Sequence, residues 1–369
     1  MAPAYYFIIF AFIISLLLGF ILLPNVLVIS HKHHLYDLPD DRKIHNIPIP
    51  RLGGVIFFPI ITITIALLMG TRYFLGYDII YISERSVLIE LLFLLCGTCI
   101  LYILGVKDDL LGVSYKWKFL VQIICGILLT LAGLWIHDGY GLLGINHIRA
   151  RFGYPITIFL VVYIINAFNM IDGLDGLASG LASVSLITFA LIFIQEKQLI
   201  YVLISISTLG VVLPFGIYNI FGNRMKGNKV FMGDTGTLTL GLILSFLFLR
   251  ICLTDTETNH IHNYYLIAFS SLAVPLFDVV RVFYLRIINH HNPFLPDRNH
   301  IHHKLLKTGM NSREVTLTII LMSIIMIMLN KWLSMHLDIN NIACIDIIIM
   351  FIFHSVTRSV IKRKGNHRR

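Results

Sequence analysis

The sequence predicts an all-α membrane protein that crosses the bilayer with about eleven helices, and three observations lead to that prediction. Hydrophobic residues make up 57% of the 369 residues and charged residues 13%, with a mean hydropathy of +0.82, whereas soluble domains carry about 25% charged residues. Uncharged apolar runs long enough to span a bilayer, about 18 residues or more, recur from one end of the chain to the other. Basic residues concentrate in alternate loops between these runs.

The apolar runs and the polar breaks between them give the positions of the expected helices. The first run is too long for a signal-peptide core and has no basic stretch before it, so we interpret it as a span. The fifth run is short, and only residues 195–198 separate the sixth from the seventh. The expected spans are 5–29, 53–70, 87–105, 117–137, 155–171, 177–195, 199–221, 237–253, 264–289, 315–334 and 342–361. They form one integral-membrane domain, residues 1–361, followed by a basic tail, residues 362–369.

The orientation follows from the basic residues, because short cytoplasmic loops are enriched in lysine and arginine. One set of alternating loops, together with the tail, holds 20 of the 29 lysines and arginines, and the opposite loops hold five. The sequence therefore predicts an N-terminus outside and a C-terminus in the cytoplasm. The net charge of +9 is then a topology signal and an attraction to anionic lipid, with no nucleic-acid partner implied. The five cysteines lie in apolar surroundings and are expected to be packing residues.

Ten of the 15 aspartates and most histidines fall on the predicted cytoplasmic side, and four clusters of them stand out. The first is the pair Asp108 and Asp109, directly after a span. Two adjacent carboxylates at a low-dielectric boundary need a cation in order to stay ionised. A divalent metal, or the amines of Lys116 and Lys118, would supply it.

The second cluster contains Asn166, Asn169, Asp172 and Asp175. Steps of three residues keep the first three of these on one broad helix face, and the glycines at 173 and 176 are expected to end the helix and leave Asp175 in a turn. This pattern predicts a polar site inside the protein. A structural polar network between helices is the alternative interpretation.

The third cluster is the loop from Val230 to Gly236, which enters a helix and carries Asp234. Backbone N–H groups at a helix start favour anions, whereas a carboxylate favours a cation. A phosphate bridged to Mg²⁺ would satisfy both. The same short loop could instead be a capped turn.

The fourth cluster contains Arg298, His300, His302 and His303. Imidazoles suit either diphosphate binding or a metal, and we favour phosphate contact because no cysteine lies nearby. The arginine adds a forked donor for phosphate or sugar oxygens. On the preceding helix, Asp278 and Arg281 are three residues apart, which fits an internal ion pair as well as a catalytic role.

Together these clusters resemble the polyprenyl-phosphate N-acetylhexosamine-1-phosphate transferases, the bacterial WecA/TagO-like group. The resemblance runs from Asp37 to about Gly309, and its motifs occur in the family order. They are Arg42-Lys43-Ile-His45 with Pro48-Ile-Pro50-Arg51-Leu-Gly53-Gly54, then Asp108-Asp109, residues 166–176, residues 231–236 and His300-Ile-His302-His303. The chain departs from the family at residues 289–292, where arginines are common, and at Lys107.

The resemblance implies a reaction in which a lipid phosphate attacks the sugar-linked phosphate of a UDP-N-acetylhexosamine. The products are a lipid-diphosphate-sugar and UMP, Mg²⁺ is required, and the site faces the cytoplasm of a bacterial inner membrane. It implies that Asp234 is the Mg²⁺ ligand and that Lys118 lies near the phosphates. Asp108 and Asp109 would act on the attacking lipid phosphate or assist the metal, and the resemblance does not assign either role to one of the two.

The resemblance also assigns the substrate contacts. Phe231 would stack on uracil and Asp175 would contact the uridine, while the other polar residues of the second cluster line the site. The diphosphate-sugar would be held by Arg298, His300, His302 and His303. The partners implied are the UDP-sugar, undecaprenyl phosphate and the lipid bilayer, and a homodimer is compatible with them.

Two other functions compete with this interpretation. The related transferase of phospho-MurNAc-pentapeptide shares the aspartates but has consecutive histidines where this chain has Ile301 between two of them. That difference favours UDP-GlcNAc as the donor. A polytopic transporter would place its polar site near the midplane and often shows repeated halves, whereas here the acids gather at one face and no repeat is visible.

Overall fold

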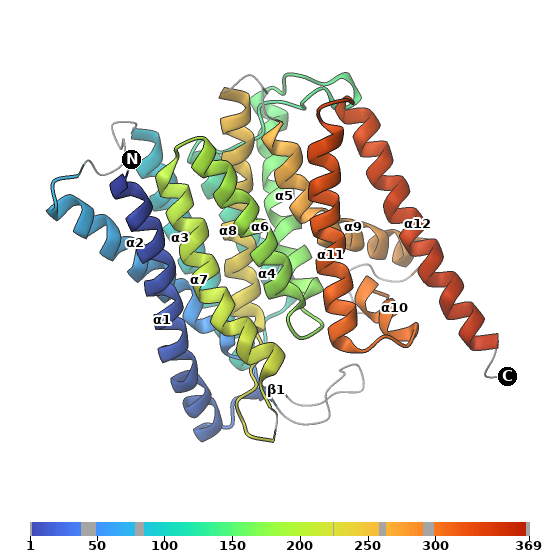
Figure 1. Cartoon of the computed structure of the whole chain (residues 1–369), viewed down its shortest axis with the longest axis horizontal. Helices are drawn as coiled ribbons and strands as arrows, with labels where there is room; N and C mark the ends of the chain where they lie inside the picture. Colours follow the sequence, from blue (N-terminus) through green and yellow to red (C-terminus); the bar gives the residue numbers. More distant parts are fainter. Residues whose placement is uncertain are drawn as a thin grey trace.

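The computed structural model describes residues 2–37, 49–77, 85–223, 225–257, 263–290 and 299–366, and nearly all of its regular structure is helical (Figure 1). The helices are α1 (Ala2–Lys32), α2 (Phe57–Phe74), α3 (Arg85–Leu111), α4 (Tyr115–Leu131), α5 (Ala150–Ile171), α6 (Leu177–Gln195), α7 (Leu199–Phe221), α8 (Gly233–Glu257), α9 (Tyr264–Ile288), α10 (Ile301–Lys307), α11 (Ser312–Leu333) and α12 (Ile339–Asn366). Two short strands, β1 (Tyr36–Asp37) and β2 (Ile49–Pro50), pair antiparallel, with Tyr36 opposite Pro50.

The helices confirm the predicted class of an all-α, multi-pass membrane protein. Ten of the described helices are long and apolar enough to cross a bilayer. The expected span at 117–137 corresponds to α4, which has 17 residues and is therefore about 26 Å long. The two chain ends lie at opposite ends of the bundle (Figure 1). The total of eleven spans and the side on which each terminus lies stay predictions.

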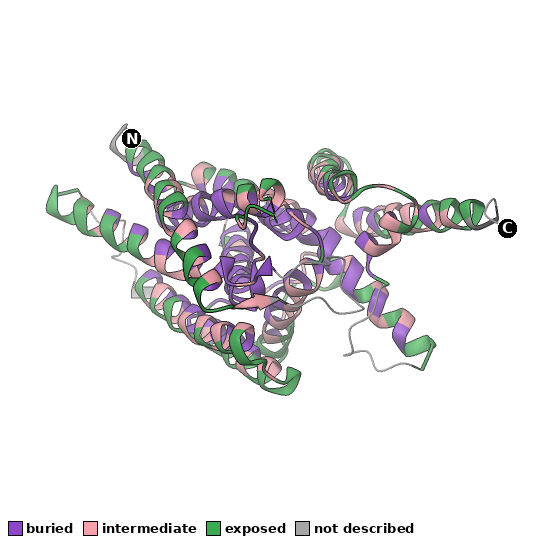
Figure 2. Ribbon diagram, turned by 90° about the horizontal axis from the view of Figure 1, so that it is seen from below, coloured by how far each residue is buried: buried purple, intermediate pink, exposed green. Residues whose placement is uncertain are grey.

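The bundle is built around α8, whose central span is almost entirely buried. Helices α3 and α5 pack along it, and α6 and α9 also contact it. Figure 2 shows this buried centre, with exposed residues on the outward faces of the peripheral helices. The outward residues of α1 and α12 are large and apolar, for example Phe10, Phe351 and Ile352. In a bilayer such faces contact lipid, so their exposure costs nothing.

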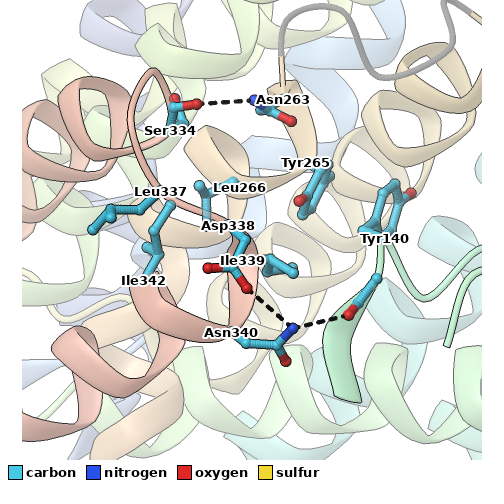
Figure 3. Close-up of a pocket in the computed structure, with 11 residues that line it drawn as sticks. Tyr140, Asn263, Tyr265, Leu266, Ser334, Leu337, Asp338, Ile339, Asn340 and Ile342 are labelled. Carbon is cyan, nitrogen blue, oxygen red and sulfur yellow. Dashed lines mark hydrogen bonds between the residues drawn. The ribbon is translucent and has the colours of Figure 1, made fainter. Parts of the chain in front are cut away.

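The two ends of the bundle carry different polar groups. We call the end that holds Asp108 and Asp234 the carboxylate end, and the opposite one the far end. At the far end, a cavity of about 320 Å³ lies between the loop that precedes α5 and the start of α12 (Figure 3). Asn340 joins these segments, because it accepts a hydrogen bond from the N–H of Leu143 at 2.8 Å and donates to the Gly141 carbonyl at 3.1 Å. The stacked rings of Tyr140 and Tyr265 line the cavity.

The far end also holds buried charges, whereas the sequence predicts polar chemistry on one face only. Glu90 on α3 accepts a hydrogen bond from the Tyr201 hydroxyl at 2.5 Å. Arg250 on α8 lies 3.6 Å from Glu90 and 3.4 Å from Glu257, and its guanidinium lies over the Tyr201 ring. We call these four residues the far-end cluster.

Candidate active site

The carboxylate end is assembled where the segment after β2 meets the start of α8. Backbone hydrogen bonds join Phe231 N to Pro50 O at 2.8 Å and Gly53 N to Phe231 O at 2.9 Å. The approach is so close that a Cβ on Gly54 would lie 2.2 Å from the Cα of Gly236. Glycine is therefore required here, and the contact brings the neighbouring Arg51 to the start of α8.

Asp109 fixes the first turn of α8 from a different helix. One carboxylate oxygen accepts from Asp234 N at 2.8 Å, and the other accepts from the N–H and the hydroxyl of Thr235 at 2.9 and 2.6 Å. The first N–H groups of a helix lack partners within the helix, and a carboxylate there satisfies them and the positive end of the helix dipole. Gly233, with φ of +72°, makes the turn into α8. Asp109 is thus committed to holding Asp234 in place.

Two cations bridge the carboxylates. The Lys118 ammonium lies 2.6 Å from Asp108 Oδ2 and also contacts Asp234 Oδ2. Arg51 lies 2.9 Å from Asp234 Oδ1 through Nη2 and 3.4 Å from Asp109 through Nε. The second oxygen of Asp108 accepts from Val113 N at 2.6 Å. The structure therefore brings all four predicted catalytic residues into one constellation.

We call Asp108, Asp109 and Asp234 the carboxylate cluster. Each offers an oxygen, and the three oxygens lie within 4.8 Å of one another. Among the described residues this is the single group of three or more potential ligands close enough to hold a metal ion. An all-carboxylate set suits a hard cation such as Mg²⁺ rather than zinc.

The charge of the site also favours a divalent cation. Asp172, at the end of α5, has its pKa raised to about 7 by burial, with the charges of Asp234 and Asp175 adding and that of Arg51 opposing. The three carboxylates of the cluster face two cations, Arg51 and Lys118, so one negative charge remains. Ionisation of Asp172 would add to this excess, which a divalent cation would neutralise.

The two predicted amides of α5 have different surroundings. Asn169 donates to Asp234 Oδ1 at 3.2 Å and to the Thr237 hydroxyl at 2.8 Å, so it belongs to the constellation. Asn166, one turn away, donates to Gln122 Oε1 at 2.5 Å and to the Val162 carbonyl. Its amide joins α4 to α5, which matches the structural network given as the alternative for this cluster.

The turn that carries Asp175 is held by a residue near the end of α7 and by one between α7 and α8. The Lys229 ammonium lies 2.6 Å from Asp175 Oδ2. Asn219 accepts from Gly176 N at 2.6 Å and donates to the Val230 carbonyl at 2.8 Å. Asp175 and Phe231, the predicted uridine contacts, therefore lie on two segments that Asn219 and Lys229 connect.

The histidines lie on and just before α10. Asp278 accepts from His300 Nδ1 at 2.8 Å, from Ile301 N at 2.9 Å and from Arg281 at 2.6 Å, so the sequence pair Asp278 and Arg281 does form an ion pair. This carboxylate fixes the tautomer of His300 and the start of α10.

His302 points toward the turn that contains Asp172. A Cβ on Gly173 would lie 2.4 Å from its Nε2. Burial, together with His303 and His300, lowers the pKa of His302 to about 3, so the ring is neutral at pH 7. Its Nδ1 is buried and has no hydrogen-bond partner in the part of the chain that the structure describes. Arg298 and the motif Arg42-Lys43-Ile-His45 lie outside the described residues.

Several residues of the site were not identified as such from the sequence. Arg51 was noted only as a member of a family motif and a loop charge, and Lys229 only as a loop charge. Thr235 lies in the third cluster but was given no role of its own, and neither Asn219 nor Gln122 was predicted to belong to the site. A short polar side chain in a helix or a loop is too common to signal a site, and only the packing of distant segments reveals these partners.

Comparison with known proteins shows to which family the chain belongs. The profile of Glycosyl transferase family 4 matches residues 91–252. A Bacillus subtilis (strain 168) protein named "Probable undecaprenyl-phosphate N-acetylglucosaminyl 1-phosphate transferase" is 34% identical over 323 residues, covering 86% of this chain and 82% of the relative. The chain belongs to the polyprenyl-phosphate N-acetylhexosamine-1-phosphate transferase family.

Two further relatives of the transferase family bear the name "Undecaprenyl-phosphate alpha-N-acetylglucosaminyl 1-phosphate transferase". The Yersinia pestis protein is 31% identical over 303 residues, covering 82% of this chain and 77% of its own length. The Escherichia coli (strain K12) protein is 32% identical over 297 residues, covering 79% and 75%. The family predicted from the five motifs is thereby confirmed.

Proposed function

We propose that this protein transfers N-acetylglucosamine-1-phosphate from UDP-GlcNAc to undecaprenyl phosphate and releases UMP. The observation that carries the proposal is the carboxylate cluster, held by Lys118 and Arg51 at a helix end in a membrane protein whose relatives bear the name of this activity. The product would start a lipid-linked polysaccharide of the cell envelope.

The reaction needs two polyanions to meet. An oxygen of the lipid phosphate attacks the phosphorus that carries the sugar, the bond from this phosphorus to the bridging oxygen breaks, and UMP leaves with that oxygen. Such phosphoryl transfers are catalysed mostly by positioning and by charge neutralisation. A site of carboxylates alone would repel both substrates, so a cation must lie between them.

Mg²⁺ fits the residues present. Asp234 would hold it, with Asp108 as the second candidate ligand, because Asp109 is bonded to the first turn of α8. When bound, Mg²⁺ would neutralise phosphate charge and stabilise the charge that develops in the transition state. Lys118 and Arg51 would then be released in part from the carboxylates to contact phosphate oxygens, for which ammonium and guanidinium groups are suited.

The remaining residues suggest where each part of the donor binds. Neutral His302 has a buried Nδ1 without a partner in the described structure, which suits a hydrogen bond to the diphosphate or the sugar. Asp278 orients His300 beside it. Phe231 and Asp175 lie on the segments that Asn219 and Lys229 connect, and we assign the uridine to them. Arg298 is proposed as a further contact of the sugar diphosphate.

We propose that the carboxylate end faces the cytoplasm of a bacterial inner membrane, with the N-terminus outside and the C-terminus inside. Twenty of the 29 lysines and arginines fall in the loops and the tail on this side. Reporter fusions after residues 80, 145, 225 and 300 should read outside, outside, inside and inside. If the fusion after residue 225 or 300 reads outside, the site residues do not share a cytoplasmic face and the proposed orientation is wrong.

The direct test of the function uses purified protein with Mg²⁺, undecaprenyl phosphate and a panel of UDP-sugars. UDP-GlcNAc should be consumed, with UMP as the nucleotide product and a lipid that retains both phosphates. Release of UDP would indicate an ordinary glycosyltransferase instead. Turnover of UDP-MurNAc-pentapeptide without turnover of UDP-GlcNAc would favour the related pentapeptide transferase.

A further inference from the structure

The short helix α10 separates the carboxylate end from a second charged region next to α12. On one side of α10, His302 packs against the Gly173 turn of the candidate active site. Two residues later, the ammonium of Lys304 lies 3.4 Å from His354 Nε2 on α12. Two residues correspond to about 200° around a helix, so the two side chains leave α10 in nearly opposite directions. Figure 1 shows α10 beside the lower half of α12.

The region next to α12 is rich in cations. We call Arg281, Lys304, Lys307 and Arg358 the cation cluster. The pKa of Lys304 is lowered to about 8 by burial and by the charges of Arg281, Arg358 and Lys307. Basic side chains that repel one another are stabilised in their charged form by a bound anion.

The acid beside this group does not balance it. Asp278 is buried and already accepts hydrogen bonds from Arg281, His300 and the N–H of Ile301. It is one negative charge beside the four basic side chains of the cation cluster. The Nη1 atom of Arg281 is buried and lacks a hydrogen-bond partner among the described residues. A planar guanidinium with a free donor is suited to phosphate oxygens.

The position of the cation cluster decides the type of anion. It lies toward the C-terminal end of α12, a helix that is mostly exposed along its length. Phe351, Ile352 and Val356, on the same stretch as His354, have large exposed apolar side chains. A ligand with a phosphate and a hydrocarbon chain could place the phosphate among the cations while its chain lies along α12. Clusters of basic residues at the membrane surface attract anionic lipid headgroups in this way.

We propose that the side of α10 that faces α12 binds the phosphate group of a membrane lipid, through Lys304, Arg281 and Arg358. The site is separate from the carboxylate cluster, and the proposal does not require the transferase reaction. Two lipids share the chemistry, namely an anionic phospholipid and undecaprenyl phosphate. A bound lipid would join α10 to α12, since α12 has few other contacts with the bundle.

The test measures lipid binding rather than turnover. The full-length protein is purified in a neutral detergent and titrated with phosphatidylglycerol, undecaprenyl phosphate, phosphatidylcholine or inorganic phosphate, and native mass spectrometry counts the bound molecules. The double variant Lys304→Gln, Arg358→Gln removes two charges from the cation cluster. The matched control Lys32→Gln, Lys226→Gln removes two exposed charges from elsewhere on the same end.

The wild type and the control should bind an anionic lipid alike, and the double variant should bind it at least roughly tenfold more weakly. Binding of both anionic lipids would support a general headgroup site, and a strong preference for undecaprenyl phosphate would assign the site to that lipid. Equal weakening in both double variants, or binding of phosphatidylcholine as tightly as of phosphatidylglycerol, would overturn the proposal. So would saturation by inorganic phosphate without lipid binding.

A folding defect is separated from a binding defect by a conservative variant. Arg358→Lys keeps the charge at the end of α12 and should retain lipid binding to within about threefold. Each variant should elute as a single species in size-exclusion chromatography. If Arg358→Lys loses lipid as completely as the double variant while unfolding at the wild-type temperature, charge at this position is not what holds the lipid.

Discussion

Helix α8 carries buried charges at both of its ends, and the two ends are built differently. At its start, Asp234 belongs to a cluster of three carboxylates bridged by Lys118 and Arg51. Toward its other end, Arg250 lies beside Glu90 and Glu257, and the Tyr201 hydroxyl donates to Glu90. Both groups are costly inside a membrane protein, so burial of charge alone does not distinguish them.

The difference lies in the way in which the charges are balanced. In the far-end cluster, Glu90 on α3 accepts a hydrogen bond from the Tyr201 hydroxyl. The Arg250 guanidinium lies close to Glu90 and to Glu257 on α8. In the carboxylate cluster three acids share two cations and retain a negative excess, to which ionised Asp172 would add. The far-end cluster also has one more carboxylate than cation, but the Glu257 side chain is half exposed to solvent. Among the described residues, only the carboxylate cluster brings three ligand oxygens close enough to hold one metal ion. We therefore expect the far-end cluster to support stability and the carboxylate cluster to support chemistry.

The largest effect is expected for Asp234→Asn. The substitution keeps the size of the side chain and the backbone hydrogen bond from residue 234 to Asp109, but removes the charge that would hold Mg²⁺. Loss of several kcal/mol of transition-state stabilisation lowers turnover by on the order of 10³-fold or more. Turnover of UDP-GlcNAc at saturating Mg²⁺ measures the effect, with size-exclusion chromatography as the folding control. A rate within tenfold of wild type would remove Asp234 from the reaction.

Lys118→Gln should have the next largest effect on turnover, on the order of 10²-fold, because one cation of the site is lost and cannot contact phosphate. The matched control is Lys116→Gln, two residues away and exposed, which should keep turnover within about twofold. Initial rates at several Mg²⁺ concentrations compare the two variants. If both lysines can be replaced without loss, the bridge between Asp108 and Asp234 is structural.

Asp108→Asn and Asp109→Asn should separate two roles that the sequence left undivided. Asp109 accepts three hydrogen bonds from the first turn of α8, so its substitution should lower the free energy of unfolding by about 1–2 kcal/mol in addition to lowering turnover. Asp108 should affect turnover with little change in stability. Thermal unfolding of both variants in the same detergent tests this. Equal destabilisation by the two substitutions would contradict the division.

The smallest effect on turnover is expected for Glu90→Gln in the far-end cluster. An amide can still accept from Tyr201 but no longer pairs with Arg250, which should cost about 2 kcal/mol of stability. The rate per folded molecule should stay within about twofold, because the change lies at the opposite end of α8. A large loss of rate without a loss of stability would show that the far end takes part in the reaction.

The sequence was sufficient for the fold class and for the site's main acids. Long apolar runs have few alternatives to membrane helices, and carboxylates at the ends of such runs are conspicuous. It did not predict α10 or the pair β1 and β2, since short elements have little periodicity. It also missed Arg51 and Lys229 as partners, because each pairs with an acid far away in the chain, Asp234 and Asp175.

The far-end cluster was missed for a different physical reason. Glu90, Tyr201 and Arg250 lie singly within three apolar helices, so no local pattern connects them. The sequence argument against a transporter, that the acids gather at one face, is therefore weaker than it looked. The distinction between a transferase and a transporter now rests on the family relationship.

The central claim is that the carboxylate cluster binds a divalent cation and the far-end cluster does not. Mn²⁺, an oxygen-preferring substitute for Mg²⁺, can be titrated into the purified protein and followed by electron paramagnetic resonance. The wild type and Glu90→Gln should each bind about one Mn²⁺ that Mg²⁺ displaces, and Asp234→Asn should lose that site. Undiminished Mn²⁺ binding by Asp234→Asn, or its loss in folded Glu90→Gln, would contradict the account.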